Sequence, residues 1–320
     1  MPDWLIERGI GEDRALLLDG NRVVAAKLRW PGELSAGQVV TGPLVTRSAG
    51  SSRGTVRLDD GTEILVDRLP KDASEGRPIP VEIRRAAVAE RGRLKRAQGR
   101  PVGGDRASLG GEPDPFATGA PVRRFPAGAW EDVWTAAWDR SIDFAGGSLL
   151  LDVTPGMTVV DIDGDRSPRE LALAAIPSLA RAIRHFDLGG SIAVDFPTLA
   201  TKADRQAVDS ALGEALAGWP HERTAMNGFG MVQLVARLQG PSLLHRLTLH
   251  RAESAARYLL RQAEGVEGAG AVMLTAHPAV IVAIKTEWLD ELARRTGREV
   301  RTTAEPALAL SGGHAQIVPR

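Results

Sequence analysis

Two candidate β-strands in the sequence end in aspartate residues. The run MTVVDID ends in Asp161 and Asp163, and the run SIAVDF presents Asp195. If these strands are neighbours in one sheet, their carboxylates meet at one edge, and such oxygen ligands suit Mg²⁺. The ion could then activate a water and shield the charge of a phosphodiester. The same pattern also fits aspartates that cap a turn or a helix, so the residues alone leave both interpretations open.

Other kinds of active group are scarce in the chain. It contains no cysteine, which excludes disulfides, thiol nucleophiles and Cys-ligated zinc or iron–sulfur sites. Its six histidines are scattered without an H-x-x-x-H pair, so none is a leading metal ligand or base. Any metal must therefore be held by oxygen or imidazole.

The charge of the chain is balanced overall but uneven along its length. Lys plus Arg and Asp plus Glu each number 40, yet residues 84–106 contain eight basic residues and two acidic ones. Such a segment attracts phosphate backbones, although basic runs are also common as plain solvated surface. The candidate nucleic-acid-binding residues in it are Arg84, Arg85, Arg91, Arg93, Lys95 and Arg96.

The first part of the chain is predicted to be β-structure. Two apolar runs within residues 14–30 surround Asp19, Gly20 and Asn21, a turn sequence typical of a hairpin. Short β-rich runs then recur from residue 37 to residue 83, and they predict a small barrel for which the OB fold is a natural candidate. Residues 97–128 are rich in Gly, Pro and polar residues and are predicted to be a linker.

The aspartates lie in an α/β part that follows this linker. Trp130, Trp134 and Trp138 recur every four residues, which predicts a helix with a buried aromatic stripe. Strands then alternate with helices predicted at residues 169–185 and 202–217, and Pro177 predicts a kink or a break in the first. The last segment is predicted to form a second small α/β unit. The five predicted segments are 1–35, 36–96, 97–128, 129–245 and 246–320.

Three segments around the aspartates resemble the ribonuclease E/G family. DVTPGMTVVDIDG is similar to the family's T-E-A-[LM]-T-x-I-D-[IV]-N, and FDLGGSIAVDFPTL is similar to its R-D-[IL]-G-G-x-[IV]-x-[IV]-D-F. NGFGMVQLVARLQGPSL resembles the third motif, R-F-G-L-[LV]-[EQ]-[ML]-[ST]-R-[KQ]-R-x-x-P-S-L, more loosely. Weaker similarity reaches the opening strands and the predicted barrel.

The resemblance implies a fold and an activity. The fold would be a multi-domain α/β protein with a ribonuclease H-like and DNase I-like catalytic part and an inserted OB-fold RNA-binding barrel. Asp161 and Asp195 would correspond to the family's metal-binding aspartates, and Asp163 stands where the family has asparagine. The implied activity is Mg²⁺-dependent cleavage of single-stranded RNA that leaves a 5′-phosphate and a 3′-hydroxyl, with the metal activating a hydroxide for in-line attack.

The sequence also departs from the family pattern. Gly228 and Ala236 stand where the third motif has arginines, and the N-x-N-x-E-A signature is replaced by the mostly apolar ELALAAIPSLA. The linker stands where the family has its sensor of 5′-monophosphates. No Phe, Tyr or Trp lies between Pro31 and Arg100, so RNA binding by the barrel is expected to be mainly electrostatic. A zinc link is excluded, while a homo-oligomer through other surfaces stays open.

Composition and motifs together leave three classes of function. The leading hypothesis is an endoribonuclease, the second is an RNA-binding protein of the same ancestry with little or no cleavage, and the third is a metal-dependent DNA nuclease or phosphatase that uses the same carboxylates. The 320 residues fit two or three domains, and no apolar run approaches the roughly 20 residues of a membrane helix. The N-terminus lacks the pattern of a secretory signal, so a cytoplasmic protein without membrane partners is expected.

Overall fold

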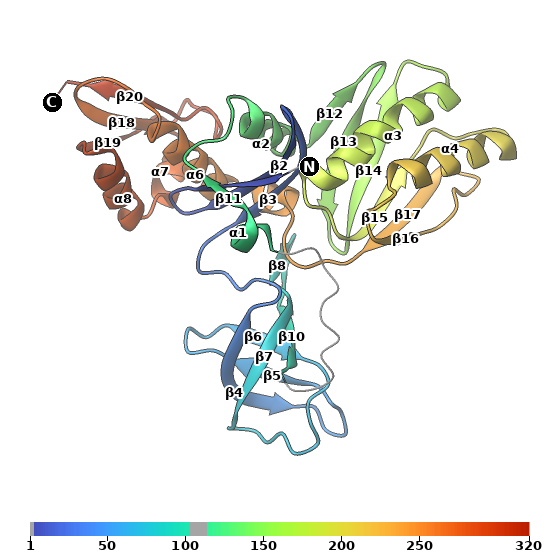
Figure 1. The fold of residues 1–320 in the computed structure, drawn as a ribbon, viewed down its shortest axis with the longest axis horizontal. Coiled ribbons are helices and arrows are strands. Elements are labelled where there is room, and N and C mark those ends of the chain that lie inside the picture. The colour runs from blue at the N-terminus through green and yellow to red at the C-terminus, as the bar shows by residue number, and fades with distance from the viewer. Residues whose placement is uncertain (1–2, 103–113, 320) are drawn as a thin grey trace. The chain divides into compact units, whose positions relative to one another are not determined.

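The computed structural model describes residues 3–102 and 114–319 and has a mixed α/β fold (Figure 1). Its internal contacts divide the chain into two compact units. The first unit combines residues 1–31, 115–131 and 246–320, and the second combines residues 32–114 and 132–245. The predicted C-terminal segment therefore does not stand alone, because it shares a unit with the N-terminal strands.

The first unit contains two sheets. One has the strand order β11-β1-β2-β3, with β1 (Asp3–Arg8), β2 (Asp13–Asp19), β3 (Arg22–Arg29) and β11 (Ala120–Val122). β2 and β3 form the predicted hairpin, and Gly20 in its turn has a φ of 59°. The other sheet has β18 (Ala271–Ala276) between β19 (Val300–Ala304) and β20 (His314–Val318). The helices of this part of the chain are α1 (Pro115–Thr118), α5 (Leu243–Leu249), α6 (Arg251–Ala263), α7 (Pro278–Ala283) and α8 (Thr286–Thr296).

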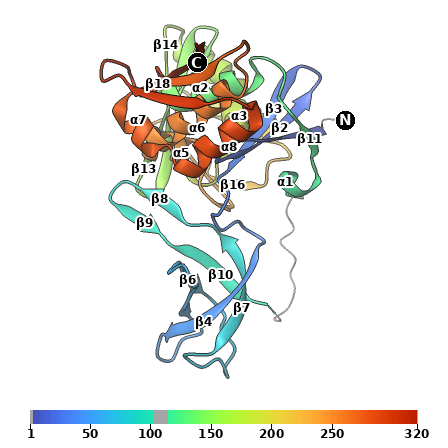
Figure 2. The same ribbon diagram turned by 90° about the vertical axis from the view of Figure 1, so that its left-hand side faces the viewer.

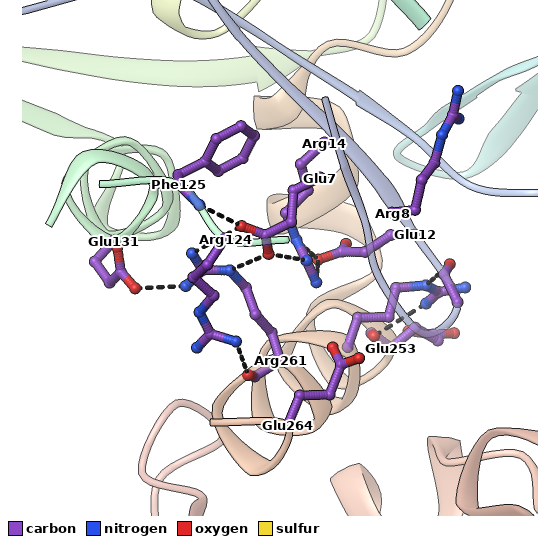
Figure 3. A network of polar contacts seen from close by, with 12 residues as sticks. Glu7, Arg8, Glu12, Arg14, Arg124, Phe125, Glu131, Glu253, Arg261 and Glu264 are labelled. Carbon is purple, nitrogen blue, oxygen red and sulfur yellow. Dashed lines mark hydrogen bonds and ion pairs between the residues drawn. The ribbon is translucent and has the colours of Figure 1, made fainter. Parts of the chain in front are cut away.

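A buried ionic network lies inside the first unit (Figure 3). The Oε1 atom of Glu7 accepts hydrogen bonds from Arg14 Nη1 at 2.7 Å and from Arg261 Nε at 2.8 Å. Arg14 Nε also donates to Glu12 at 2.7 Å, and the backbone N–H of Phe125 donates to Glu7 Oε2 at 3.0 Å. Because full burial of an unpaired charge is costly, these pairs fix how segments far apart in the sequence pack together.

The second unit includes the predicted barrel, which is closed with the strand order β10-β6-β5-β4-β7 (Figure 2). Its strands are β4 (Val39–Arg47), β5 (Gly54–Arg57), β6 (Glu63–Val66), β7 (Pro78–Arg85) and β10 (Ala97–Pro101). Alternating residues such as Leu44, Ile64 and Val81 are 0% exposed and fill the interior. β10 lies beyond the predicted boundary at residue 96, so the barrel takes its closing strand from the segment predicted to be a linker.

A six-stranded sheet forms the rest of this unit, in the order β12-β13-β14-β15-β17-β16. Its strands are β12 (Ser141–Phe144), β13 (Gly147–Thr154), β14 (Met157–Gly164), β15 (Gly190–Asp195), β16 (His221–Arg223) and β17 (Met231–Ala236). α3 (Pro168–His185) and α4 (Lys202–Ala215) lie on one face of it (Figure 1). α3 runs on through Pro177, so the helix is not broken there.

The strands of this sheet alternate between a covered and an accessible face. Val160, Ile162 and Val194 are buried, whereas Asp161 and Asp195 between and beyond them are exposed. Such alternation is expected when one face packs on helices and the other does not. α2 (Ala129–Asp139) carries the three predicted core tryptophans, which are 0–6% exposed, as predicted.

No helix in the described ranges is long and apolar enough to cross a membrane.

Candidate active site

Asp161 and Asp195 are direct neighbours on the accessible face of the six-stranded sheet. β14 and β15 run parallel, and their register pairs Asp161 with Asp195. Residues that pair in a sheet point to the same side, so the two carboxylates share one face. The connection through α3 makes the strands parallel, since a helical crossover returns the chain in the same direction. The structure thus brings together two of the predicted site residues.

Asp163 lies farther along the same strand. It is two residues beyond Asp161, shares its face, and pairs across the sheet with Ser148 of β13. Its Oδ1 atom accepts a hydrogen bond from the backbone N–H of Gly164 at 2.8 Å. The carboxylate of Asp163 is therefore partly used in holding the end of β14.

The pair of aspartates fits a magnesium ion better than a metal that needs a full protein cage. Within residues 3–102 and 114–319, no set of three or more His, Asp or Glu side chains is arranged to hold a metal. Mg²⁺, however, keeps several waters and commonly uses only one or two carboxylates. In the described part of the chain, the side chains of Asp161 and Asp195 have neither an ion-pair partner nor a hydrogen bond. Their carboxylate oxygens are therefore available as metal ligands.

A tight turn adjoins the aspartate pair. Residues 227–230 precede β17, whose first residue, Met231, pairs with Asp195. The Oδ1 atom of Asn227 accepts hydrogen bonds from the backbone N–H groups of Phe229 at 2.9 Å and Met231 at 3.1 Å. Gly230 has a φ of 92°, and a Cβ atom there would lie 2.2 Å from the carbonyl oxygen of Phe196. Only glycine fits this close approach, which fixes the turn against the end of β15.

Gly228 in this turn occupies the position where the family motif has an arginine. A Cβ atom on Gly228 would meet no heavy atom within 4 Å, so the position opens into free space. The turn therefore has room for a longer side chain, although this chain has none there.

Most of the predicted basic residues are already engaged in ion pairs or hydrogen bonds. Glu90 pairs with both Arg93 and Lys95 across the hairpin of β8 (Val88–Glu90) and β9 (Arg93–Lys95). Arg96 pairs with Glu63 at 2.7 Å, and Arg85 donates to the carbonyl oxygen of Arg96 at 2.9 Å. The positive charge of these residues is therefore partly neutralised by Glu90 and Glu63 within this segment.

Glu90 is the centre of this hairpin. Its side chain is 3% exposed, and burial raises its pKa, but hydrogen bonds and charges from Lys95 and Arg93 outweigh burial and hold the pKa below its ordinary value. Its Oε1 atom also accepts from the backbone N–H of Gly156 at 3.3 Å. Arg91, at the hairpin turn, is exposed and has no ion pair among the described residues.

A second basic cluster joins Arg84 to two arginines outside the predicted set. Burial lowers the pKa of Arg237, and the positive charges of Arg84 and Arg100 lower it further, while Glu82 opposes this effect. The backbone N–H of Ala86 donates to the carbonyl oxygen of Gln239 at 2.8 Å, which holds the two segments together. Arg84 pairs with Glu82 at 3.5 Å, and Arg100 is the cross-strand partner of Glu82, so the three arginines have one carboxylate near them.

Sequence reasoning missed this cluster for two different reasons. Arg100 belongs to the basic run of residues 84–106, but its local sequence does not distinguish it from the other cations there. Arg237 lies in the third motif directly after Ala236, which stands at a family arginine position, and the residues around Arg237 are known only once the segments after β17 and β7 are brought together.

Comparison with known proteins gives similarity over the part of the chain that carries these residues. The chain is 28% identical over 200 residues to ribonuclease G of Escherichia coli (strain K12). The matched region covers 53% of this chain and 41% of that protein. It is 31% identical over 123 residues to ribonuclease E of the same strain, covering 34% of this chain and 11% of that protein. Ribonuclease E of Buchnera aphidicola is 32% identical over 89 residues, which cover 25% of this chain and 9% of that protein.

The chain thus spans about two fifths of the ribonuclease G that it matches. Residues 127–237, which include Asp161, Asp195 and the turn at Phe229, match the Ribonuclease E/G family as a unit. Both kinds of similarity agree with the motifs and with the register of the two aspartates, and residues 127–237 of the chain are similar to the ribonuclease E/G family.

Proposed function

We propose that this chain is a Mg²⁺-dependent endoribonuclease that cleaves single-stranded RNA and leaves 5′-phosphate and 3′-hydroxyl ends. The observation that carries this proposal is the register of β14 and β15, in which Asp161 and Asp195 are paired on the accessible face. The similarity to ribonucleases G and E supports RNA as the substrate.

Asp161 and Asp195 would hold the metal, because adjacent carboxylates repel each other unless a cation lies between them. When bound, Mg²⁺ offsets charge on a phosphodiester and makes a water more acidic. The two aspartates would also fix the position of the scissile phosphate, since they extend from strands rather than from loose loops.

The cluster of Arg84, Arg100 and Arg237 would bind the RNA backbone away from the aspartates. Three guanidinium groups beside one carboxylate leave an excess of positive charge, and guanidinium groups suit phosphate oxygens. Such contacts provide affinity without sequence preference.

The second candidate function is RNA binding with little or no cleavage. It is favoured by Gly228 and Ala236, which remove two positive charges from the positions of the family arginines. Their loss would weaken stabilisation of the charge that develops on the phosphate during cleavage.

One assay separates these candidates. A labelled, AU-rich single-stranded RNA is incubated with the purified protein, with Mg²⁺ or with EDTA, and matched single-stranded DNA and duplex RNA serve as controls. We expect the single-stranded RNA to give Mg²⁺-dependent fragments that carry a 5′-phosphate. A phosphatase should remove this phosphate, and only then should a kinase add a new one. Binding without fragments would favour the second candidate, and cleavage of the DNA alone would contradict both.

A further inference from the structure

The barrel of this protein lacks the side chains that usually stack on unpaired bases. No Phe, Tyr or Trp occurs between residues 31 and 100. Proteins that bind single strands combine positive charge with aromatic platforms, because every base has a face that stacks. Any aromatic residue that stacks on an RNA base would therefore lie outside residues 31–100.

Phe229 is the aromatic residue most open to solvent in the described part of the chain. Its side chain is 82% exposed, and the other large apolar residues that are comparably exposed are aliphatic. An isolated exposed apolar residue is common and needs no explanation by itself. The position of Phe229 is what distinguishes it.

The turn that carries Phe229 is held by hydrogen bonds. The side chain of Asn227 accepts from the backbone N–H groups of Phe229 and Met231, and the backbone N–H of Gly230 donates to the carbonyl oxygen of Asn227 at 3.2 Å. The exposure of Phe229 is therefore a feature of an ordered turn. An aromatic side chain fixed in water is prepared for a ligand because little backbone entropy is lost on binding.

The same turn is fixed next to the aspartate pair. The backbone N–H of Phe196 donates to the carbonyl oxygen of Gly230 at 3.2 Å, and Phe196 directly follows Asp195. Met231 pairs with Asp195, and Phe229 precedes Met231 by two residues in the turn, so its Cα atom lies no more than roughly 7 Å from that of Met231. The turn that carries the ring therefore adjoins the position where a phosphate would be held by Asp161 and Asp195.

We propose that Phe229 is a base-stacking platform that holds one unpaired RNA base beside the phosphodiester bound at Asp161 and Asp195. The proposal rests on the proposed function, since it takes single-stranded RNA as the ligand. It gives the site a reason to prefer single strands, because a base in a duplex is not free to stack on a protein ring.

The test measures binding with Ca²⁺ in place of Mg²⁺, so that a cation still offsets the charge of the two aspartates while cleavage is suppressed. Short single-stranded RNAs carry the fluorescent base 2-aminopurine at one position at a time, and its quenching reports stacking. We expect the parent to quench one or two adjacent positions, Phe229→Tyr and Phe229→Trp to retain the quenching, and Phe229→Leu and Phe229→Ala to lose it. Affinity should fall roughly 5- to 150-fold in the Leu and Ala variants.

The matched control is Val282→Ala, which removes an apolar side chain that is 85% exposed in the other unit and should leave quenching unchanged. An abasic site at the quenched position should weaken the parent but not Phe229→Leu. Equal quenching and affinity in the parent and Phe229→Leu would overturn the proposal. It would also be overturned if Phe229→Leu altered the sedimentation of the protein without altering RNA affinity, because Phe229 would then belong to a protein interface.

Failure of this proposal is distinguishable from failure of the proposed function. A parent that binds RNA and shows the quenching but never cleaves supports the platform and contradicts the endonuclease. A parent that cleaves but shows no dependence on Phe229 contradicts the platform alone.

Discussion

Two carboxylates without an ion-pair partner lie at neighbouring positions of the candidate site. Asp161 and Asp195 occupy paired positions on parallel strands, and no cation of the described residues pairs with either of them. A fold that keeps two like charges together without a partner loses stability by their repulsion. A bound divalent cation would remove that cost.

Mg²⁺ is therefore expected to raise the thermal stability of the parent protein. A ligand that binds only the folded state stabilises it by mass action, by about 2.7 kcal/mol at a concentration 100 times its Kd. Asp161→Asn and Asp195→Asn should each reduce the Mg²⁺-dependent rise in Tm while keeping the fold. The rise is measured by thermal melts at increasing MgCl₂, with NaCl at equal ionic strength as the control. An unchanged rise in both variants would show that the ion binds elsewhere.

Gly228 offers a gain of function at the same site. Its Cβ direction is open, so Gly228→Arg should fold like the parent. The added guanidinium, near the aspartate pair, should contact phosphate and increase the slope of log Kobs against log salt by about 0.7. Cleavage should rise as well, because a cation there stabilises charge on the phosphate. Gly228→Gln, with a long neutral side chain, is the control, and an equal effect of Gln and Arg would contradict an electrostatic cause.

At the scale of elements, the hairpin of β8 and β9 shows why a basic run does not by itself define an RNA-binding surface. Glu90 holds Arg93 and Lys95, and Glu63 holds Arg96. Reversing Arg93 and Lys95 to Glu would place like charges beside buried Glu90, and reversing Arg96 would place one beside Glu63. A loss of RNA binding in that triple variant would therefore reflect damage to the hairpin as well as lost contacts.

The cluster of Arg84, Arg100 and Arg237 allows a cleaner test of electrostatic binding. Arg100→Gln and Arg237→Gln together remove two charges that share one carboxylate. We expect the salt slope for single-stranded RNA to fall by about 1.4 and the affinity to fall at low salt for all sequences alike. Arg301→Gln, whose partner Glu299 lies at 2.7 Å, is the control. A slope equal to that of the parent would remove this cluster from the RNA path.

Local sequence signals predicted several elements well. Strand alternation and the turn at Gly20 indicated the first hairpin, and apolar runs ending in Asp161 and Asp195 indicated two neighbouring strands, which the register confirms. The barrel was predicted, but its closing strand β10 was placed in a linker because a short strand rich in polar residues has little alternation. Of the kink or break predicted at Pro177, the break is absent: α3 is continuous there, and it buries Ile176 and Leu179 around the proline.

Local sequence signals could not predict the contacts between segments that are far apart in the sequence. Glu7 and Arg261 are 254 positions apart, and nothing near either residue indicates its partner. Likewise, the pairing of Glu90 with two cations depends on the register of a short hairpin rather than on composition. The metal and RNA roles of the predicted residues stay predictions, whereas the position of Asp161 beside Asp195 is a property of the fold.

At the scale of the whole molecule, the buried network around Glu7 links stability to pH. Burial raises the pKa of Glu7, but the hydrogen bond and charge of Arg261 and the charge of Arg14 outweigh burial, so its pKa lies below the ordinary 4.5. A carboxylate whose pKa is lowered by folding stabilises the folded state above its unfolded pKa, and this contribution is lost as the pH falls through the folded pKa. The free energy of unfolding should therefore decrease below pH 4.5.

Glu7→Gln tests this dependence. It should lower the free energy of unfolding at pH 7 by about 3–5 kcal/mol, since Arg14 and Arg261 lose the charge that balances them in the interior. Its remaining stability should vary less with pH below 4.5 than that of the parent. Urea unfolding at several pH values gives both quantities. Equal stability of the two proteins at pH 7 would show that the network contributes little.

The central claim is that Asp161 and Asp195 act together in metal-dependent cleavage of RNA. Its most direct test is the rate of cleavage of one labelled single-stranded RNA at saturating Mg²⁺ by the parent, Asp161→Asn and Asp195→Asn, with RNA affinity measured in parallel in EDTA. The account predicts that each substitution lowers kcat/KM on the order of 100-fold or more, with RNA affinity nearly unchanged. Cleavage by either variant at the rate of the parent would contradict it.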